Sequence, residues 1–249
     1  MRRWVLPAVP FAILLLCFFS YHLSKRSVAV FLRQKEQIWV TYYEDGEPSE
    51  PILMKEEVIV LDAGHGGIDP GKVGVSGVLE REINLSLVYR LAAALGERGY
   101  QVVLTRTGAD GLYREGSPNK KREDMANRVR IIEEAAPALT VSIHQNSYPD
   151  ASVRGAQVFY YGGSEPGKLL ADCIQKGIQA AAPESGKRSI KANQDYYLLT
   201  HTTCPIVIVE CGFLSNPTEE KLLTTESYQE LLVAGIVDGI EAYLASASR

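Results

Sequence analysis

Between residues 58 and 244 the sequence alternates short apolar runs with longer amphipathic segments, and this alternation restricts the fold more than any other feature. The apolar runs are typical of buried strands, and they are VIVLDA, QVVLTR, ALTVSI, AQVFYY and PIVIVE. The segments between and after them have the length and polarity of helices, at about residues 83–98, 120–135, 166–181 and 227–244. Strands and helices that alternate in this way predict an α/β fold with a mainly parallel sheet, flanked by helices on both faces.

The first 26 residues differ from the rest of the chain. Arg2 and Arg3 precede an uncharged, mostly apolar stretch at residues 4–21, and Lys25 and Arg26 follow it. Such a stretch is just long enough for a bilayer, which needs ~20 residues, and no small-residue cleavage site follows it. We therefore expect an uncleaved signal-anchor, with a cleaved signal peptide as the alternative. In either case the positive charges place the remainder of the chain outside the cytoplasm.

Residues 27–56 show little pattern, and we interpret them as an N-terminal extension or linker. The stretch VFLRQKEQIWVTYYE is compatible with one or two strands, and DGEPSEP is rich in turn-forming residues. The main domain therefore begins near Glu57.

Charge and cysteine content exclude two classes of protein. The net charge is -4, from 26 Lys and Arg against 30 Asp and Glu, and no basic stripe follows the chain, so nucleic acid is not an expected partner. Cys17 lies in the apolar stretch, which leaves Cys173, Cys204 and Cys211. A straight strand between the last two would hold their sulfurs too far apart to bond, so we expect free thiols rather than a disulfide framework.

Three of the expected strands end on a side chain that can bind a metal, namely His65, His144 and Glu210. Ligands of open parallel sheets bind beyond the carboxyl ends of the strands, so these side chains converge if the strands are neighbours. Two neutral imidazoles and one carboxylate are the protein ligands of a catalytic zinc, which keeps a fourth position for water. The sequence therefore indicates a zinc site at this edge of the sheet.

Glu80 and Glu82 precede the first expected helix and offer a second source for the carboxylate. Because they are two residues apart, one can face the site while the other faces water, and their spacing does not decide which. If one of them binds the metal, Glu210 is free to act as the general base toward water.

Two other chemistries fit parts of the same segments less well. Gly66 to Lys72 matches the phosphate-loop pattern G-x-x-x-x-G-K, but Val73 stands where Ser or Thr should hold magnesium, and no helix begins there. A cysteine hydrolase would pair Cys211 with His144. Alternation along the strand places Cys211 on the face opposite Glu210, so both cannot line one crevice.

Four blocks of the chain resemble a known family. The blocks VLDAGHGGIDPG, LEREINLSL, TVSIHQNS and IVIVECGFLSNPTEE occur in the order found in zinc-dependent N-acetylmuramoyl-L-alanine amidases. The resemblance spans about residues 58–244. It implies a catalytic domain at residues 57–245, folded as a single three-layer α/β domain with a twisted, mainly parallel sheet.

The resemblance also implies roles for individual residues. It assigns His65, Glu80 and His144 as zinc ligands, which selects Glu80 over Glu82, and Glu210 as the catalytic residue. The implied reaction is hydrolysis of the amide between N-acetylmuramic acid and L-alanine in peptidoglycan, which releases stem peptides without a covalent intermediate. Ala63, Ser147 and Cys211 depart from the residues that the family often has, but none of these departures removes a ligand.

The stretches REGSPNKKREDMANRV and GAQVFYYGG, with a lone domain after an apolar segment, resemble the germination-specific amidases that act on spore cortex. Two alternatives stay open, an amidase that remodels vegetative wall and a peptidoglycan-binding module without activity. The expected partners are peptidoglycan and, through residues 1–26, the membrane.

Further polar residues could line the groove because the family is also polar at their positions, namely Arg106, Arg122, Asn127, Arg128 and Asn146. For the three arginines we expect solvated or structural roles. We interpret the basic cluster of Lys187, Arg188 and Lys191 as a solvated loop, and His201 as a surface residue.

Overall fold

The computed structural model describes residues 27–34, 37–44, 47–48 and 54–247. The apolar stretch for which we expect a signal-anchor lies outside these residues. Within the described part of the chain, no helix has the length and apolar character that crossing a membrane requires.

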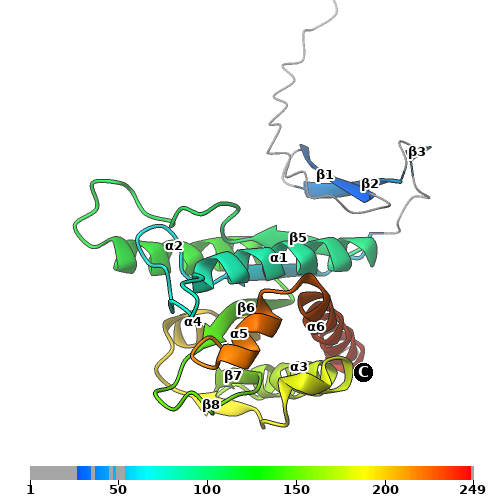
Figure 1. The fold of residues 1–249 in the computed structure, drawn as a ribbon. Coiled ribbons are helices and arrows are strands. Elements are labelled where there is room, and N and C mark those ends of the chain that lie inside the picture. The colour runs from blue at the N-terminus through cyan, green and yellow to red at the C-terminus, as the bar shows by residue number, and fades with distance from the viewer. Residues whose placement is uncertain (1–26, 35–36, 45–46, 49–53, 248–249) are drawn as a thin grey trace, which may run out of the picture.

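The N-terminal extension forms a small antiparallel sheet of three strands (Figure 1). Its strands are β1 (Ser27–Gln34), β2 (Gln37–Glu44) and β3 (Glu47–Pro48). The strands β1 and β2 agree with the one or two strands that the sequence allows in this segment. The two residues of β3 are too few to show an alternation.

The main domain is built on a six-stranded sheet in the order β5-β4-β6-β9-β7-β8. Its strands are β4 (Val58–Ala63), β5 (Gln101–Leu104), β6 (Leu139–Asn146), β7 (Gln157–Tyr161), β8 (Lys191–Asn193) and β9 (Ile206–Phe213). The first four strands in this order are parallel, and β7 runs antiparallel to β9. The expectation of a mainly parallel sheet is confirmed.

Helices cover both faces of the sheet, as the alternating pattern predicts. One face carries α1 (Glu80–Glu97), α3 (Glu165–Ala181), α5 (Pro217–Leu223) and α6 (Glu226–Ala247), and α3 and α6 lie side by side (Figure 1). The other face carries α2 (Lys120–Ala135) and α4 (Tyr197–His201). The 3₁₀ turn η1 (Pro183–Ser185) follows α3. The three-layer architecture is thus confirmed.

The central strands bury different chemistry on their two faces. Toward α1, α3 and α6, they present mainly apolar side chains, such as Leu61, Val141 and Val209, with Gln145 at the end of β6 as a polar exception that donates to Asn84 on α1. Successive side chains of a strand alternate between the faces. The intervening residues, including Asp62, Ser142 and Glu210, therefore face α2 and α4, and the polar residues of the sheet gather on that side.

The expected helices and strands lie within a few residues of the observed ones, with one difference that affects the site. Helix α1 begins at Glu80 and not near Ile83, so Glu80 and Glu82 lie in its first turn. Negative charges are favourable there because the helix N-terminus carries partial positive charge. The short elements β8, α4 and α5 show no periodicity long enough to predict.

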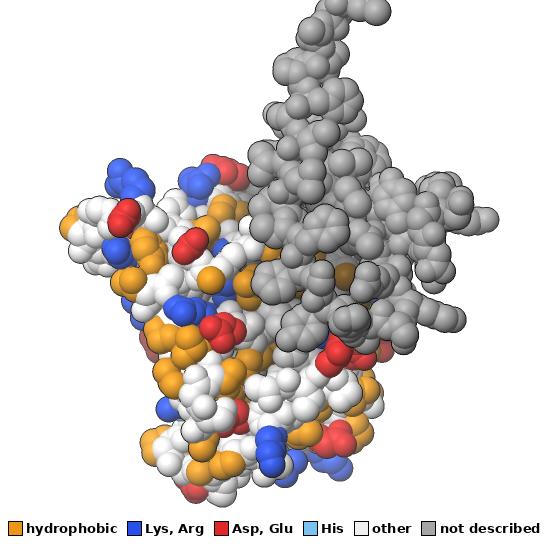
Figure 2. Space-filling model, turned by 45° about the horizontal axis from the view of Figure 1, so that its top comes forward, with side chains coloured by type: hydrophobic (Ala, Val, Ile, Leu, Met, Phe, Trp, Pro, Cys, Tyr) orange, Lys and Arg blue, Asp and Glu red, His pale blue; other side chains and the backbone are white. Residues whose placement is uncertain are grey.

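The surface has no dominant sign of charge on the face that Figure 2 shows. Lys and Arg side chains are interspersed with Asp and Glu side chains over the described part of this face. This distribution agrees with the small net charge of -4.

Candidate metal centre

His65, Glu80 and His144 come together from three separate elements. His65 follows β4, Glu80 is the first residue of α1, and His144 lies near the end of β6, which pairs with β4. One ligand atom from each residue lies within 4.8 Å of those of the other two. Glu80 Oε1 lies 3.1 Å from His65 Nε2 and 3.0 Å from His144 Nδ1. Two imidazoles and one carboxylate at these separations are a donor set suited to zinc.

The Glu80 carboxylate is held by the backbone around it as well as by the histidines. Its Oε1 accepts a hydrogen bond from the backbone N–H of Gln145 at 3.0 Å, and its Oε2 accepts one from the backbone N–H of Lys72 at 2.7 Å. Burial alone would raise the pKa of Glu80, but the hydrogen bonds from His144 and His65 outweigh burial and lower this pKa. Glu82 is exposed. The structure therefore brings Glu80, and not Glu82, to the histidines.

Two glycines let backbone approach the site closely. A Cβ atom on Gly64 would lie 2.2 Å from the imidazole of His144. Gly71 has a φ of +68°, and a Cβ atom there would lie 2.6 Å from Glu80 Oε2. The loop from Gly66 to Lys72 therefore wraps the Glu80 carboxylate. No helix follows it until Glu80, so it does not have the geometry of a phosphate-binding loop.

Asp69 is a functional residue that the sequence reasoning missed. Its Oδ2 lies 3.1 Å from His65 Nδ1, on the opposite side of the ring from Glu80. Its Oδ1 accepts a hydrogen bond from the Gly71 amide at 3.0 Å. A carboxylate on the second nitrogen of a metal-binding histidine fixes the tautomer and orientation of the ring. The available signal was the presence of an acidic residue four positions after His65, inside the glycine-rich loop.

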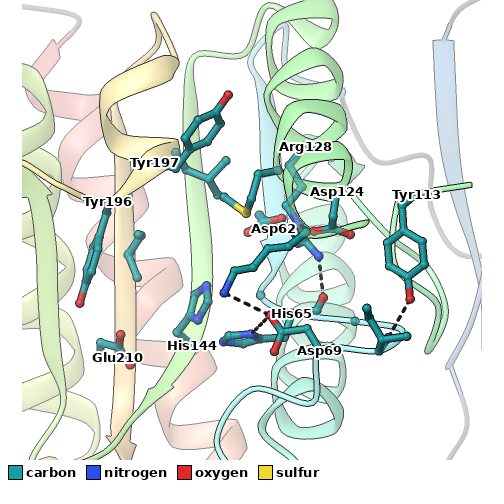
Figure 3. Close-up of a pocket in the computed structure, with 17 residues that line it drawn as sticks. Asp62, His65, Asp69, Tyr113, Asp124, Arg128, His144, Tyr196, Tyr197 and Glu210 are labelled. Carbon is teal, nitrogen blue, oxygen red and sulfur yellow. Dashed lines mark hydrogen bonds and ion pairs between the residues drawn. The ribbon is translucent and has the colours of Figure 1, made fainter. Parts of the chain in front are cut away.

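Glu210 lies beside this cluster. Residue 210 on β9 pairs in register with His144 on β6, and the two side chains face the same cavity (Figure 3). Its Oε2 is buried and accepts no hydrogen bond from the described residues. Burial raises the pKa of Glu210 to about 7; the charge of Glu80 adds to the rise, and His144 partly opposes it. A buried carboxyl group with this pKa is suited to accept and release a proton near neutral pH.

The site opens into a cavity of about 530 Å³. Its lining includes Tyr196, Tyr197, Leu198, Ile208, Ile68, Asp69, Tyr113 and Lys121, and in Figure 3 Tyr196 lies on the side of Glu210 whereas Asp69 and Tyr113 lie on the side of His65. In Figure 3, His144 lies between Glu210 on one side and His65 with Asp69 on the other. A substrate in the cavity would therefore meet the histidine cluster and Glu210 together.

Comparison with known proteins agrees with the chemistry of the cavity. Residues 59–242 match the model of the family described as N-acetylmuramoyl-L-alanine amidase. The chain belongs to this family. It is therefore an enzyme that hydrolyses peptidoglycan, and as a cell-wall enzyme it works outside the cytoplasm.

Individual relatives support the assignment over most of the chain. The germination-specific N-acetylmuramoyl-L-alanine amidase of Bacillus subtilis is 36% identical over 190 residues, which cover 75% of this chain and 79% of the relative. The CwlD amidase of Clostridioides difficile, solved in complex with the GerS lipoprotein, is 38% identical with a TM-score of 0.74 and covers 76% of this chain and 99% of that one. The catalytic domain of CwlV from Bacillus (Paenibacillus) polymyxa is 31% identical with a TM-score of 0.67, and the match covers 76% of this chain and 98% of that one.

Beneath the histidines, the amidase buries a network of charges centred on Arg128. Its guanidinium donates to Asp62 Oδ1 and to Asp124 Oδ2, each at 2.6 Å. The same group donates to the carbonyl oxygen of Ala63 at 2.7 Å and to that of His65 at 2.5 Å. His65 has a φ of 62°, which is uncommon for a residue with a side chain. Arg128 therefore holds the backbone of His65 in a conformation that it would not otherwise favour.

Asp62 completes this network and was also missed. It accepts hydrogen bonds from Thr105 and Ser142 in addition to the bond from Arg128. Burial would raise the pKa of Asp62, but the Arg128 charge and these hydroxyl groups lower it to about 2. From the sequence, we considered only His65, the residue that follows β4, as a functional residue of this segment. We therefore gave no role to Asp62, which lies within the strand.

The other candidate residues lie outside the cavity. Arg106 is buried and donates to the carbonyl oxygens of Ala63, Gly64 and Arg81, so the structural role expected for it is confirmed. The remaining candidates do not line the cavity, and they are Arg122, Asn127, Asn146, Lys187, Arg188, Lys191 and His201. His201 is exposed and stacks on Tyr197, as expected of a surface histidine.

The cysteines do not support the alternative of a cysteine hydrolase. Cys173, Cys204 and Cys211 are free, as predicted, and Cys17 lies outside the described residues. Cys211 is buried in the apolar core on the face opposite Glu210, and burial raises the pKa of its thiol. A thiol in that environment is not a nucleophile.

Proposed function

We propose that this amidase holds one zinc ion with His65, Glu80 and His144, and uses Glu210 as its general base and acid. The observation that carries the proposal is the position of the buried Glu210 carboxyl group beside a cluster of two imidazoles and one carboxylate. The cluster has the ligand types and number of a catalytic zinc site. Asp69 would orient His65 through its second ring nitrogen.

The residues of the chain then divide the chemistry among them. A zinc ion, when bound, supplies a Lewis acid that polarises the scissile carbonyl group and makes water more acidic. Its positive charge would also favour the ionised form of Glu210 and so lower the pKa of this group. The Glu210 carboxylate accepts a proton from the attacking water, and then donates that proton to the leaving α-amine of L-alanine. The products are the glycan strand and a free stem peptide.

We propose a role in spore cortex maturation for germination. Its support is the 36% identical germination-specific amidase of Bacillus subtilis and the likeness of residues 114–129 and 155–163 to that subgroup. Remodelling of vegetative wall is the alternative, because probable cell wall amidases of Staphylococcus aureus are 29% identical over 195 residues. Spores that complete cortex hydrolysis normally after deletion of the gene would favour the alternative.

We also propose that residues 1–26 anchor the enzyme in the membrane and that residues 57–245 form the catalytic domain. The support for the anchor is the charge-flanked apolar stretch without a cleavage site. A mature protein that begins near Ser27 would show instead that the segment is a cleaved signal peptide.

The experiment that tests the reaction is incubation of the purified protein with peptidoglycan, followed by detection of new amino-terminal alanine. The proposal predicts that alanine amino termini accumulate with the wild type and hardly at all with Glu210→Gln. A wild type that binds peptidoglycan but releases no alanine amino termini would instead be a binding module without activity.

A further inference from the structure

We propose that Lys121 forms a carboxylate-binding subsite, which receives the stem peptide on the leaving-group side of the scissile amide. The subsite would bind the first free carboxylate of the peptide, the α-carboxylate of its second residue. The inference rests on the proposed reaction at Glu210, and it adds the direction in which the substrate lies across the cavity.

The first support comes from the charges on the walls of the cavity. Asp62, Asp69, Asp124 and Glu210 contribute acidic groups, whereas Lys121 and Arg128 are the lysine and arginine among the described residues that line it. The Arg128 side chain is 1% exposed, and its guanidinium group already donates hydrogen bonds to Asp62, Asp124 and two carbonyl groups. Of these two cations, Lys121 is the more accessible to an anionic ligand, because its contact with Asp69 is long and exposed.

The surroundings of Lys121 leave its ammonium group available. Its side chain is 79% exposed, and its Nζ lies 3.9 Å from Asp69 Oδ2. An exposed pair at that distance contributes little energy and exchanges readily with water. Asp69 is already engaged by His65 and by the Gly71 amide. A carboxylate that enters the cavity can therefore compete with Asp69 for Lys121, with some repulsion from the Asp69 carboxylate as the cost.

The position of Lys121 in α2 adds a second attraction for an anion. It is the second residue of this 16-residue helix, whose N-terminus carries partial positive charge. The neighbouring Lys120 lies over the ring of Tyr113, with its Nζ 5.4 Å from the ring centroid. Two lysines and a helix N-terminus therefore lie at this rim of the cavity, beside Asp69.

The opposite wall has a different chemistry, which fixes the direction of the substrate. Tyr196 lies across His144 from Asp69 in Figure 3, and Tyr197, Leu198 and Ile208 also line the cavity. Aromatic and apolar side chains suit the faces of sugar rings, whereas they offer no charge to a carboxylate. The geometry thus assigns the glycan strand to the side of the cavity that carries Tyr196, and the stem peptide to the side that carries Lys121.

The chemistry of the substrate places a carboxylate near this rim. Beyond the scissile amide come L-alanine and then D-glutamate, which continues the chain through its side-chain carboxyl group and keeps its α-carboxylate free. The Cα atoms of these two residues are about 3.8 Å apart. The first negative charge of the peptide therefore lies one residue beyond the leaving nitrogen, within the reach of a lysine on the cavity wall.

The test compares two soluble glycan-tripeptides that differ only in whether the second residue carries an α-carboxylate or an α-carboxamide. Full-length wild type, Lys121→Met and Arg122→Met are assayed in detergent for kcat/KM, with zinc content measured for each. Arg122 is the matched control because it is the next residue of α2, is exposed and does not line the cavity.

We expect Lys121→Met to lower kcat/KM on the carboxylate substrate by about fivefold, the upper end of the range for an exposed ion pair. The carboxamide substrate should change by less than about twofold, and Arg122→Met should leave both substrates unchanged. Equal losses on both substrates, no loss on either, or the same loss with Arg122→Met would overturn the proposal.

A failure of the proposed reaction can be told apart from a failure of the subsite. If the wild type turns over neither substrate, calorimetric binding of the same pair to the wild type and Lys121→Met decides the question. A preference for the carboxylate ligand that Lys121→Met abolishes would support the subsite without the reaction, and equal binding by both proteins would contradict it.

Discussion

His144 on β6 and Glu210 on β9 pair in register on adjacent parallel strands, and both side chains face the cavity. Their proximity is therefore set by the register of two buried strands and not by a flexible loop. A slip of one residue in β9 would turn Cys211 toward the cavity and Glu210 into the apolar core. The burial of both strands strongly disfavours such a slip, so the sheet itself holds the base beside the histidine cluster.

The raised pKa of Glu210 predicts a pH-dependent cost to stability in the metal-free enzyme. A carboxyl group with a pKa of about 7 in the folded state and 4.5 in the unfolded state destabilises the fold as pH rises between these values. We expect the stability of chelated Glu210→Gln relative to chelated wild type to rise by roughly 3 kcal/mol from pH 4 to pH 8. Denaturant unfolding at the two pH values measures this difference. A constant difference would show that Glu210 titrates normally.

Arg128 should be required for both stability and metal binding. Its removal leaves Asp62 and Asp124 buried without their charge partner, and unpairing a buried ion pair costs about 3–5 kcal/mol. We expect Arg128→Met to lose that much unfolding free energy and to bind zinc about 10- to 100-fold more weakly, because the His65 carbonyl loses its donor. Arg130→Met on the same helix is the control, since Arg130 is exposed and pairs with Asn127 and Glu134 on that helix. An Arg128→Met protein of normal zinc affinity would remove Arg128 from the site.

Asp62 should make the stability of the folded protein depend on pH in acid. The pKa of Asp62 is about 2 in the folded state and 3.8 in the unfolded state. The stabilising contribution of Asp62 is therefore complete above pH 3.8 and is lost as pH falls toward 2. Acid unfolding of Asp62→Asn should therefore depend less on pH over this window than unfolding of the wild type. Identical slopes for the two proteins would contradict this account of the Asp62 and Arg128 pair.

Much of this site follows from the sequence because it depends on local pattern. The alternation along β9 places Glu210 and Cys211 on opposite faces, and the carboxyl ends of parallel strands share one edge, so His65, His144 and Glu210 could be expected together. The choice of Glu80 over Glu82 needed the family resemblance, because it depends on where α1 begins.

The supporting residues could not be predicted in the same way. Arg128 reaches Asp62 and His65 across more than 60 residues of sequence, and only the packing of α2 on the sheet brings them together. The direction of β7 was also open, because a strand has the same apolar pattern whether it runs parallel or antiparallel to its neighbour.

Gly64 should not tolerate even a methyl group. The Cβ atom of Gly64→Ala would lie 2.2 Å from the His144 ring, so the imidazole must move away from Glu80. We expect zinc affinity to fall by about 10- to 100-fold, as happens when ligand-orienting contacts are lost. Gly116→Ala is the control, because a Cβ atom at Gly116 meets nothing within 4 Å. Zinc titration of both variants measures the effect, and equal affinities would contradict the close approach at Gly64.

The measurement that tests the central claim most directly is the zinc content and amide hydrolysis of Glu210→Gln beside Glu80→Gln. The account predicts that Glu210→Gln keeps its zinc while turnover falls by the ~10²- to 10⁴-fold typical of losing a general acid–base group. It predicts that Glu80→Gln is poor in zinc, since Glu80 lies between the two histidines. A Glu210→Gln protein with near-normal turnover, or a Glu80→Gln protein with full zinc content, would contradict the assignment of ligand and base.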